Sequence, residues 1–209
     1  MGMSRLPELR RNELSTAGQA VWDLLVETRG SRVVTDQGSL RGPFNAFVHA
    51  PDIGGPLASL GAILRFGTSF GNRLTELAII TIAASWQAEY EWVTHARHAR
   101  EAGVPDAVID AIRRRVDPPF TNEDEQIVYS AAIQLTADGQ LSQAAYDAAH
   151  GLLGDGGVVE LVALCGYYTT ISFMLNAFAV PPPGVEPTWP GSQAAAAPDP
   201  RTGRTPTAR

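Results

Sequence analysis

A glutamate and two histidines stand at helical spacing in the stretch from Asn72 to Gly103. Glu91 precedes His95 by four positions and His98 by seven. At 100° per residue, the three side chains project from one helix face, within about 60° of one another. A carboxylate one turn before an imidazole can accept its hydrogen bond, set its tautomer and raise its basicity. The spacing therefore allows a hydrogen-bonded pair of Glu91 and His95.

A second carboxylate, Glu76, lies fifteen positions before Glu91. It points to a similar side only if one unbroken helix runs through both residues, and the SWQAEY segment between them could hold a break. The trio of Glu91, His95 and His98 also has the composition of a two-histidine, one-carboxylate metal site. Such spacing on a single helix has less specificity than a zinc-protease motif. Alternatively, the chain is a non-catalytic binding protein whose histidines are structural or surface groups.

The motif RLTELAIITIAASWQAEYEWVTHARHAREAGV, with Glu76, Glu91 and His95, resembles the signature of the carboxymuconolactone decarboxylase family, which includes the alkylhydroperoxidase D-like proteins. Residues 42–70 and 158–184 also resemble segments of its decarboxylase-like branch. The resemblance covers roughly residues 14–184 and implies a compact multi-helix fold of that family. Redox members carry a CxxC pair, and this chain has Ala88 and Glu91 at those positions. Without a dithiol couple, peroxidase chemistry of that kind is not expected.

The resemblance implies a cofactor-independent acid/base enzyme in which His95 transfers the proton, Glu91 is its partner and Glu76 a third catalytic group. The reaction would be decarboxylation, or a related proton transfer, of a small carboxylated or lactone-type substrate. An anionic substrate would need cationic partners, for which Arg65, Arg73 and Arg97 are candidates. Aromatic walls and hydrogen-bond donors would complete the pocket; the candidates are Trp86, Tyr90, Trp92, Asn45, His49, Tyr168 and Asn176.

The composition limits the kinds of partner and the cell compartment that are expected for the protein. Sixteen basic and 22 acidic residues give a formal net charge of −6, and RRR at 113–115 is the only dense basic run, so no nucleic-acid partner is expected. Cys165 is the only cysteine, which fits a reducing cytoplasm. The start of the chain has no apolar signal-peptide core. Residues 158–180 are long and apolar enough to span a membrane, but Glu160 and Asn176 favour a helix that is buried by neighbouring helices or by another subunit of a homo-oligomer.

Apolar spacing predicts an all-α domain, because no useful segment alternates apolar and β-branched residues with polar ones. Residues 1–13 are polar and are expected to be a flexible N-terminus. The helical domain spans 14–180, and 181–209 is a Pro/Ala-rich tail predicted to be disordered. Within the domain, helices are expected over 16–30, 57–67, 72–103, 106–116, 121–136, 142–153 and 157–179.

Overall fold

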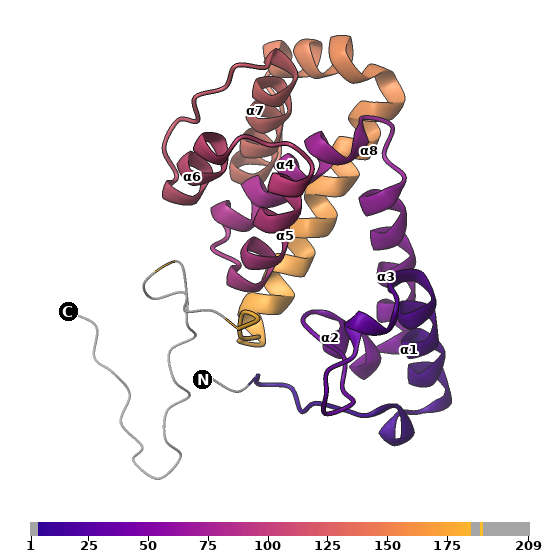
Figure 1. Ribbon diagram of the computed structural model, residues 1–209. Helices are drawn as coiled ribbons and strands as arrows, with labels where there is room; N and C mark the ends of the chain where they lie inside the picture. The colour runs from indigo at the N-terminus through magenta and orange to yellow at the C-terminus, as the bar shows by residue number, and fades with distance from the viewer. Residues whose placement is uncertain (1–3, 185–188, 190–209) are drawn as a thin grey trace, which may run out of the picture.

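The computed structural model describes residues 4–184 and 189, and these residues contain no named β-strand (Figure 1). The all-α prediction is therefore confirmed. Of two isolated antiparallel bridges, Arg10 with Ser39 ties the N-terminal segment to the loop before α2, and Val34 with Leu40 lies within that loop. The helices are η1 (Arg11–Glu13), α1 (Thr16–Arg29), η2 (Ser31–Val33), α2 (Phe44–His49), α3 (Pro51–Phe66), α4 (Gly71–Ser85), α5 (Glu89–Glu101), α6 (Asp106–Arg114), α7 (Glu123–Asp138) and α8 (Gln143–Ala177).

Helix α4 is the centre of the fold. Every residue from Leu74 to Ala84 is buried, as expected of a helix that is apolar or small on all sides and so must be surrounded. Helices α5, α7 and α8 pack around it, while α1, α2 and α3 pack on one another and form a separate group at lower right in Figure 1. Helix α3 connects this group to α4 and α8.

The chain breaks between α4 and α5, which settles the position of Glu76. Helix α4 ends at Ser85, and Gln87 has a left-handed backbone with φ of 49°. The amide N–H of Ala88 then donates to the carbonyl of Ala83 at 2.9 Å, which closes the turn. Helix α5 therefore folds back on α4, and Glu76 faces α5 from a separate helix.

Two expected helices near the C-terminus run on as one element. The predicted start at Ser142 is confirmed, because the Ser142 side chain accepts a hydrogen bond from the amide of Ala145. The expected turn reduces to a kink at Gly154, whose φ of 67° and ψ of 178° suit glycine far better than other residues. By length and composition alone α8 could cross a membrane, and half of its apolar window is buried inside the protein.

Both ends of the described chain contact the helical domain. In the segment predicted to be flexible, the Arg5 amide donates to the Phe178 carbonyl at 2.8 Å. At the other end, Trp189 is 8% exposed and its ring packs edge-on against Trp92, with 5.4 Å between centroids. Residues 185–188 and 190–209, the rest of the predicted disordered tail, lie outside the described residues.

Candidate active site

A cavity of about 1260 Å³ opens where α1 and α3 approach α4, α5 and α8. The motif residues Glu76, Glu91, His95 and His98 all line it. Helix α4 supplies Glu76 and α5 supplies the other three. The structure therefore brings the three predicted catalytic residues into one place.

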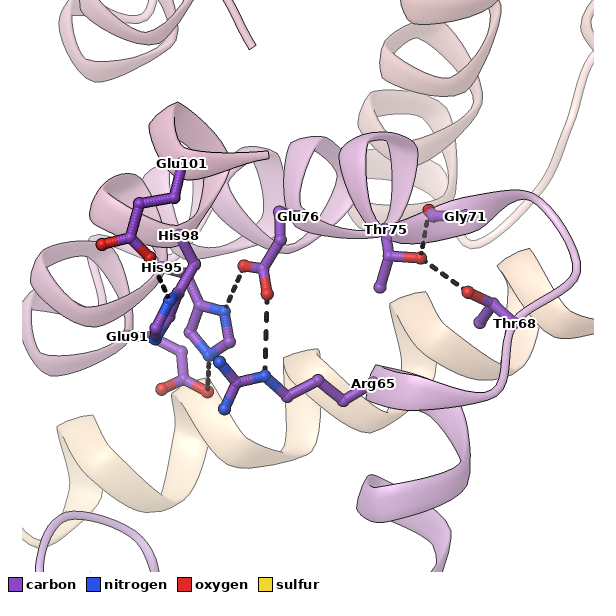
Figure 2. A network of polar contacts seen from close by, with 9 residues as sticks. All are labelled: Arg65, Thr68, Gly71, Thr75, Glu76, Glu91, His95, His98 and Glu101. Carbon is purple, nitrogen blue, oxygen red and sulfur yellow. Dashed lines mark hydrogen bonds and ion pairs between the residues drawn. The ribbon is translucent and has the colours of Figure 1, made fainter. Parts of the chain in front are cut away.

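The most buried contact of the site joins Glu76 to His95. Oε2 of Glu76 lies 2.6 Å from Nδ1 of His95, and both residues are less than 5% exposed (Figure 2). A carboxylate at this distance accepts a hydrogen bond from Nδ1–H, which leaves Nε2 as the nitrogen that exchanges a proton. Glu76 therefore has the orienting position that sequence spacing had suggested for Glu91.

Glu91 lies on the opposite side of the imidazole. Its Oε1 is 3.8 Å from Nε2 of His95, beyond hydrogen-bond distance. Arg65 reaches into the same place from the end of α3, with Nε 3.6 Å from Oε1 of Glu76. In Figure 2 the guanidinium of Arg65 points to the carboxylate of Glu76, and its charge also acts on Glu91. The imidazole thus has a carboxyl group at each nitrogen and a cation close by.

The two carboxyl groups differ in proton affinity. Burial alone would raise the pKa of Glu76, but the charge and hydrogen bond of His95, with Arg65, outweigh it and hold that pKa below its usual value. Burial raises the pKa of Glu91, and here His95 and Arg65 do not compensate. The two environments therefore shift the pKa values of the two carboxyl groups in opposite directions.

His98 does not complete a metal site with Glu91 and His95. Its Nδ1 lies 3.2 Å from Oε2 of Glu101, and its ring meets the His95 ring edge-on at 5.9 Å. Burial lowers the pKa of His98, and the charge of Arg65 acts in the same direction. Within residues 4–184 and 189, no three His, Cys, Asp or Glu side chains are arranged to hold a metal ion.

Two of the seven predicted substrate-binding residues line the cavity, namely Tyr90 and Tyr168. The Tyr168 ring meets the His95 ring edge-on at 5.3 Å. Burial raises the pKa of Tyr168 well above that of an ordinary tyrosine and that of Tyr90 to about 12, so both phenols are protonated hydrogen-bond donors at neutral pH.

The other five predicted substrate-binding residues are not among those that line this cavity. On α2, Asn45 and His49 bind the Pro7 carbonyl at 3.0 and 2.9 Å, which secures the N-terminal segment. Trp92 contacts Trp189 instead. The Asn176 side chain donates to the backbone carbonyl of Trp86 at 2.8 Å, and the Trp86 ring meets the Phe173 ring edge-on at 4.6 Å. These five side chains contact other chain segments.

Two of the three arginines predicted as cationic partners of a substrate line the cavity, and the third does not. Arg65 and Arg97 line the cavity, whereas Arg73 pairs with Asp124 and Glu125 of α7. Sequence reasoning missed Arg29 of α1 and Tyr167 of α8, which also line the cavity. No local pattern singles them out, because only the packing of α1 on α3 and of α3 on α8 brings them near the site.

Comparison with known proteins agrees with this fold. Residues 51–133, which contain the whole Glu76–His95 hairpin, match the sequence model of the carboxymuconolactone decarboxylase family. No curated protein matches the chain in sequence. A solved alkylhydroperoxidase AhpD core, an uncharacterized peroxidase-related protein from Ralstonia eutropha JMP134, superposes with a TM-score of 0.69 at 16% identity, covering 88% of this chain and 94% of its own.

A second solved structure, the debrominase Bmp8 in complex with 2,3,4-tribromopyrrole, has a TM-score of 0.65 at 14% identity and covers 86% of this chain and 93% of its own. Likenesses at these identities establish the fold. The family is named for a decarboxylase and this second structure is a debrominase, so both names refer to enzymes. Residues 51–133 thus resemble the carboxymuconolactone decarboxylase family in sequence, and the chain has the fold of the AhpD-like structure.

Proposed function

We propose that the protein is an acid/base enzyme that acts on a small carboxylated or lactone-type substrate by decarboxylation or a related proton transfer. The observation that carries the proposal is the buried arrangement of Glu76, His95 and Glu91. Glu76 lies 2.6 Å from one imidazole nitrogen and Glu91 lies 3.8 Å from the other. The imidazole is thereby fixed in one tautomer while its other nitrogen faces a carboxyl group whose pKa is raised by burial.

In a decarboxylation, the substrate carboxylate leaves as CO2 and its bonding electron pair delocalises into an adjacent electron sink, such as an unsaturated lactone. The carbanion equivalent then takes up a proton. We assign that delivery to Nε2 of His95, with Glu91 as the group that restores the proton and Glu76 as the fixed anion. Arg65 and the phenols of Tyr90 and Tyr168 line the same cavity and can stabilise the developing enolate.

The proposal requires no metal or cofactor, although a metal-dependent enzyme and a non-catalytic binding protein are the competing functions. Elemental analysis of the purified protein, repeated for His95→Ala and His98→Ala, tests whether the protein is a metal-dependent enzyme. Stoichiometric metal that both variants lose would replace our proposal with a metal-dependent one. The binding-protein alternative predicts that no substrate is turned over.

The direct test is a screen of unsaturated lactone acids for CO2 release, followed by His95→Gln. Loss of the proton donor should lower kcat by about 10²- to 10⁴-fold. His98→Gln is the matched control, because it removes a second imidazole from the same cavity without touching Glu76, and it should change kcat by less than about threefold. Full turnover in His95→Gln would refute the acid/base assignment.

We also propose that the protein acts as a cytoplasmic homo-oligomer. Large apolar side chains are exposed along one side of α3, where Ile53, Ile63 and Phe66 are 59, 64 and 65% exposed. Contact with a second subunit would remove this surface from water. Sedimentation velocity at micromolar concentration should give a species larger than one chain, and a monomer would rule the proposal out.

A further inference from the structure

Arg29 is a cation that faces the cavity without an acidic partner. Its guanidinium donates to Oγ1 of Thr28 at 3.1 Å and to the Ala58 carbonyl at 3.4 Å, and lies 5.1 Å from the centroid of the Phe44 ring. No carboxylate of the described residues forms an ion pair with it. These contacts use two of the five N–H donors of an arginine. Burial lowers the pKa of Arg29, so the charged guanidinium would be stabilised by a bound anion.

A missing side chain on α3 brings a second donor to Arg29. A Cβ on Gly61 would lie 2.1 Å from the hydroxyl oxygen of Tyr167 and 3.1 Å from Nη2 of Arg29. The two polar groups are therefore no farther apart than the sum of these distances, close enough for one carboxylate to contact both. Any larger residue at 61 would collide with the Tyr167 hydroxyl and move it from this position.

The Tyr168 ring connects this pair of donors to His95, the proposed proton-transfer residue. The rings of Tyr167 and Tyr168 meet at 5.2 Å, and the rings of Tyr168 and His95 meet at 5.3 Å. A single small molecule can therefore contact Tyr167 at one end and His95 at the other. Phe44 and Phe66 also line the cavity and provide apolar surface for the body of such a molecule.

The other arginines of the cavity are placed differently. Arg65 pairs with Glu76 at 3.6 Å and Arg97 with Glu101 at 3.8 Å, while Arg41 lies 3.7 Å from Asp36. Arg32 is exposed, and its Nε donates to the Arg29 carbonyl at 3.3 Å. Only Arg29 combines partial burial, a neighbouring phenol and no carboxylate partner among these five described cations.

We infer that Arg29 and Tyr167, which the absence of a side chain at Gly61 allows to approach each other, form a carboxylate-binding subsite for an unsaturated or aromatic acid. The inference rests on the proposed function in assigning the same cavity to the substrate. The guanidinium and the phenol would each donate to the carboxylate, and charge-assisted bonds of this kind are the stronger class of hydrogen bond. The planar body of the acid would then extend towards His95.

The test compares benzoate with benzamide, which has nearly the same shape and no charge. Isothermal titration of the full chain should give tighter binding of benzoate. Arg29→Gln should weaken benzoate binding by about ten- to a hundredfold and leave benzamide unchanged. Arg32→Gln is the matched control, since it removes the same charge from an exposed position in the same cavity, and it should change benzoate affinity by about twofold or less.

Two further variants keep the inference testable if Arg29→Gln folds poorly. Tyr167→Phe deletes only the hydroxyl group and should lower benzoate affinity by about three- to tenfold, while Gly61→Ala should displace the Tyr167 hydroxyl and lower it as well. Equal loss in Arg29→Gln and Arg32→Gln, equal affinity for benzoate and benzamide, or no benzoate binding would each overturn the subsite.

The subsite and the proposed reaction fail in different experiments. His95→Gln should retain the affinity for benzoate, because it leaves Arg29 and Tyr167 in place. Unimpaired turnover in His95→Gln would refute the proposed reaction while the benzoate preference still supported the subsite. A missing benzoate preference, together with inactive His95→Gln, would refute the subsite alone.

Discussion

The carboxylate of Glu76 lies 2.6 Å from Nδ1 of His95, although the two residues are nineteen positions apart and belong to different helices. Glu91, one turn before His95 on the same helix, stays 3.8 Å from the other nitrogen. The imidazole is therefore oriented by α4 across the α4–α5 hairpin. In the function that we propose, this division gives the two carboxyl groups separate tasks, one that orients the imidazole and one that exchanges a proton.

Glu76→Gln and Glu91→Gln should therefore impair turnover differently. An amide at 76 cannot hold Nδ1–H as a carboxylate does, so kcat should fall by about 10²-fold or more with little change in KM. An amide at 91 removes a titrating group, so the pH dependence of kcat should change its shape. Steady-state kinetics between about pH 5 and 9 on the substrate from the lactone screen measures both effects. Identical pH profiles in wild type and Glu91→Gln would contradict the role of Glu91.

Glu91 should make the folded protein less stable as the pH rises. Because burial raises its pKa, the native state binds this proton more tightly than the unfolded chain does. Its contribution to stability is thus present at low pH and is lost as the pH rises above the ordinary value for glutamate. Glu91→Gln removes this loss, so the variant should exceed wild type in unfolding free energy by about 1 kcal/mol or more near pH 8.

Urea unfolding of both proteins across this pH range measures the difference, which should shrink towards about pH 4. Glu76→Gln is the contrast, because the folded-state pKa of Glu76 is lowered. Its stabilising contribution is present above the ordinary glutamate value and is lost as the pH falls through the lowered one. This variant should be less stable than wild type at pH 8. Equal pH dependence in all three proteins would contradict these assignments.

Arg73 holds α7 against α4. It pairs with the fully buried carboxylate of Glu125 and lies 2.5 Å from Oδ2 of Asp124. Arg73→Met would leave Glu125 charged, buried and unpaired, so the unfolding free energy should fall by about 3 to 5 kcal/mol. Asp124→Asn, at a partly exposed position, should cost about 1 kcal/mol or less. Adding Glu125→Leu to Arg73→Met should recover most of the loss, and a double variant no more stable than Arg73→Met would contradict the pairing.

Local spacing was enough to predict α5 and the shared face of Glu91, His95 and His98. It could not place Glu76, because the break after α4 uses a left-handed Gln87, a residue that carries no turn signature. The same limit applies to Trp92 and Asn176. Their residue types suited a polar pocket, but a residue type does not reveal which neighbouring segment its side chain will meet. Arg29 was missed for the converse reason, because its partners lie on α3 and α8.

The Cys165 thiol should be unreactive in the native protein. It is 3% exposed, and burial raises its pKa to about 12, so very little of the nucleophilic thiolate exists at neutral pH. A disulfide reagent such as DTNB should label it only as fast as the chain unfolds, and within seconds in concentrated denaturant.

Because Cys165 is the only cysteine, a resolving thiol is also missing. Thiol-dependent reduction of hydroperoxides should therefore be undetectable in wild type and in Cys165→Ala alike. Activity that survived in Cys165→Ala would show that hydroperoxide chemistry proceeds through another group.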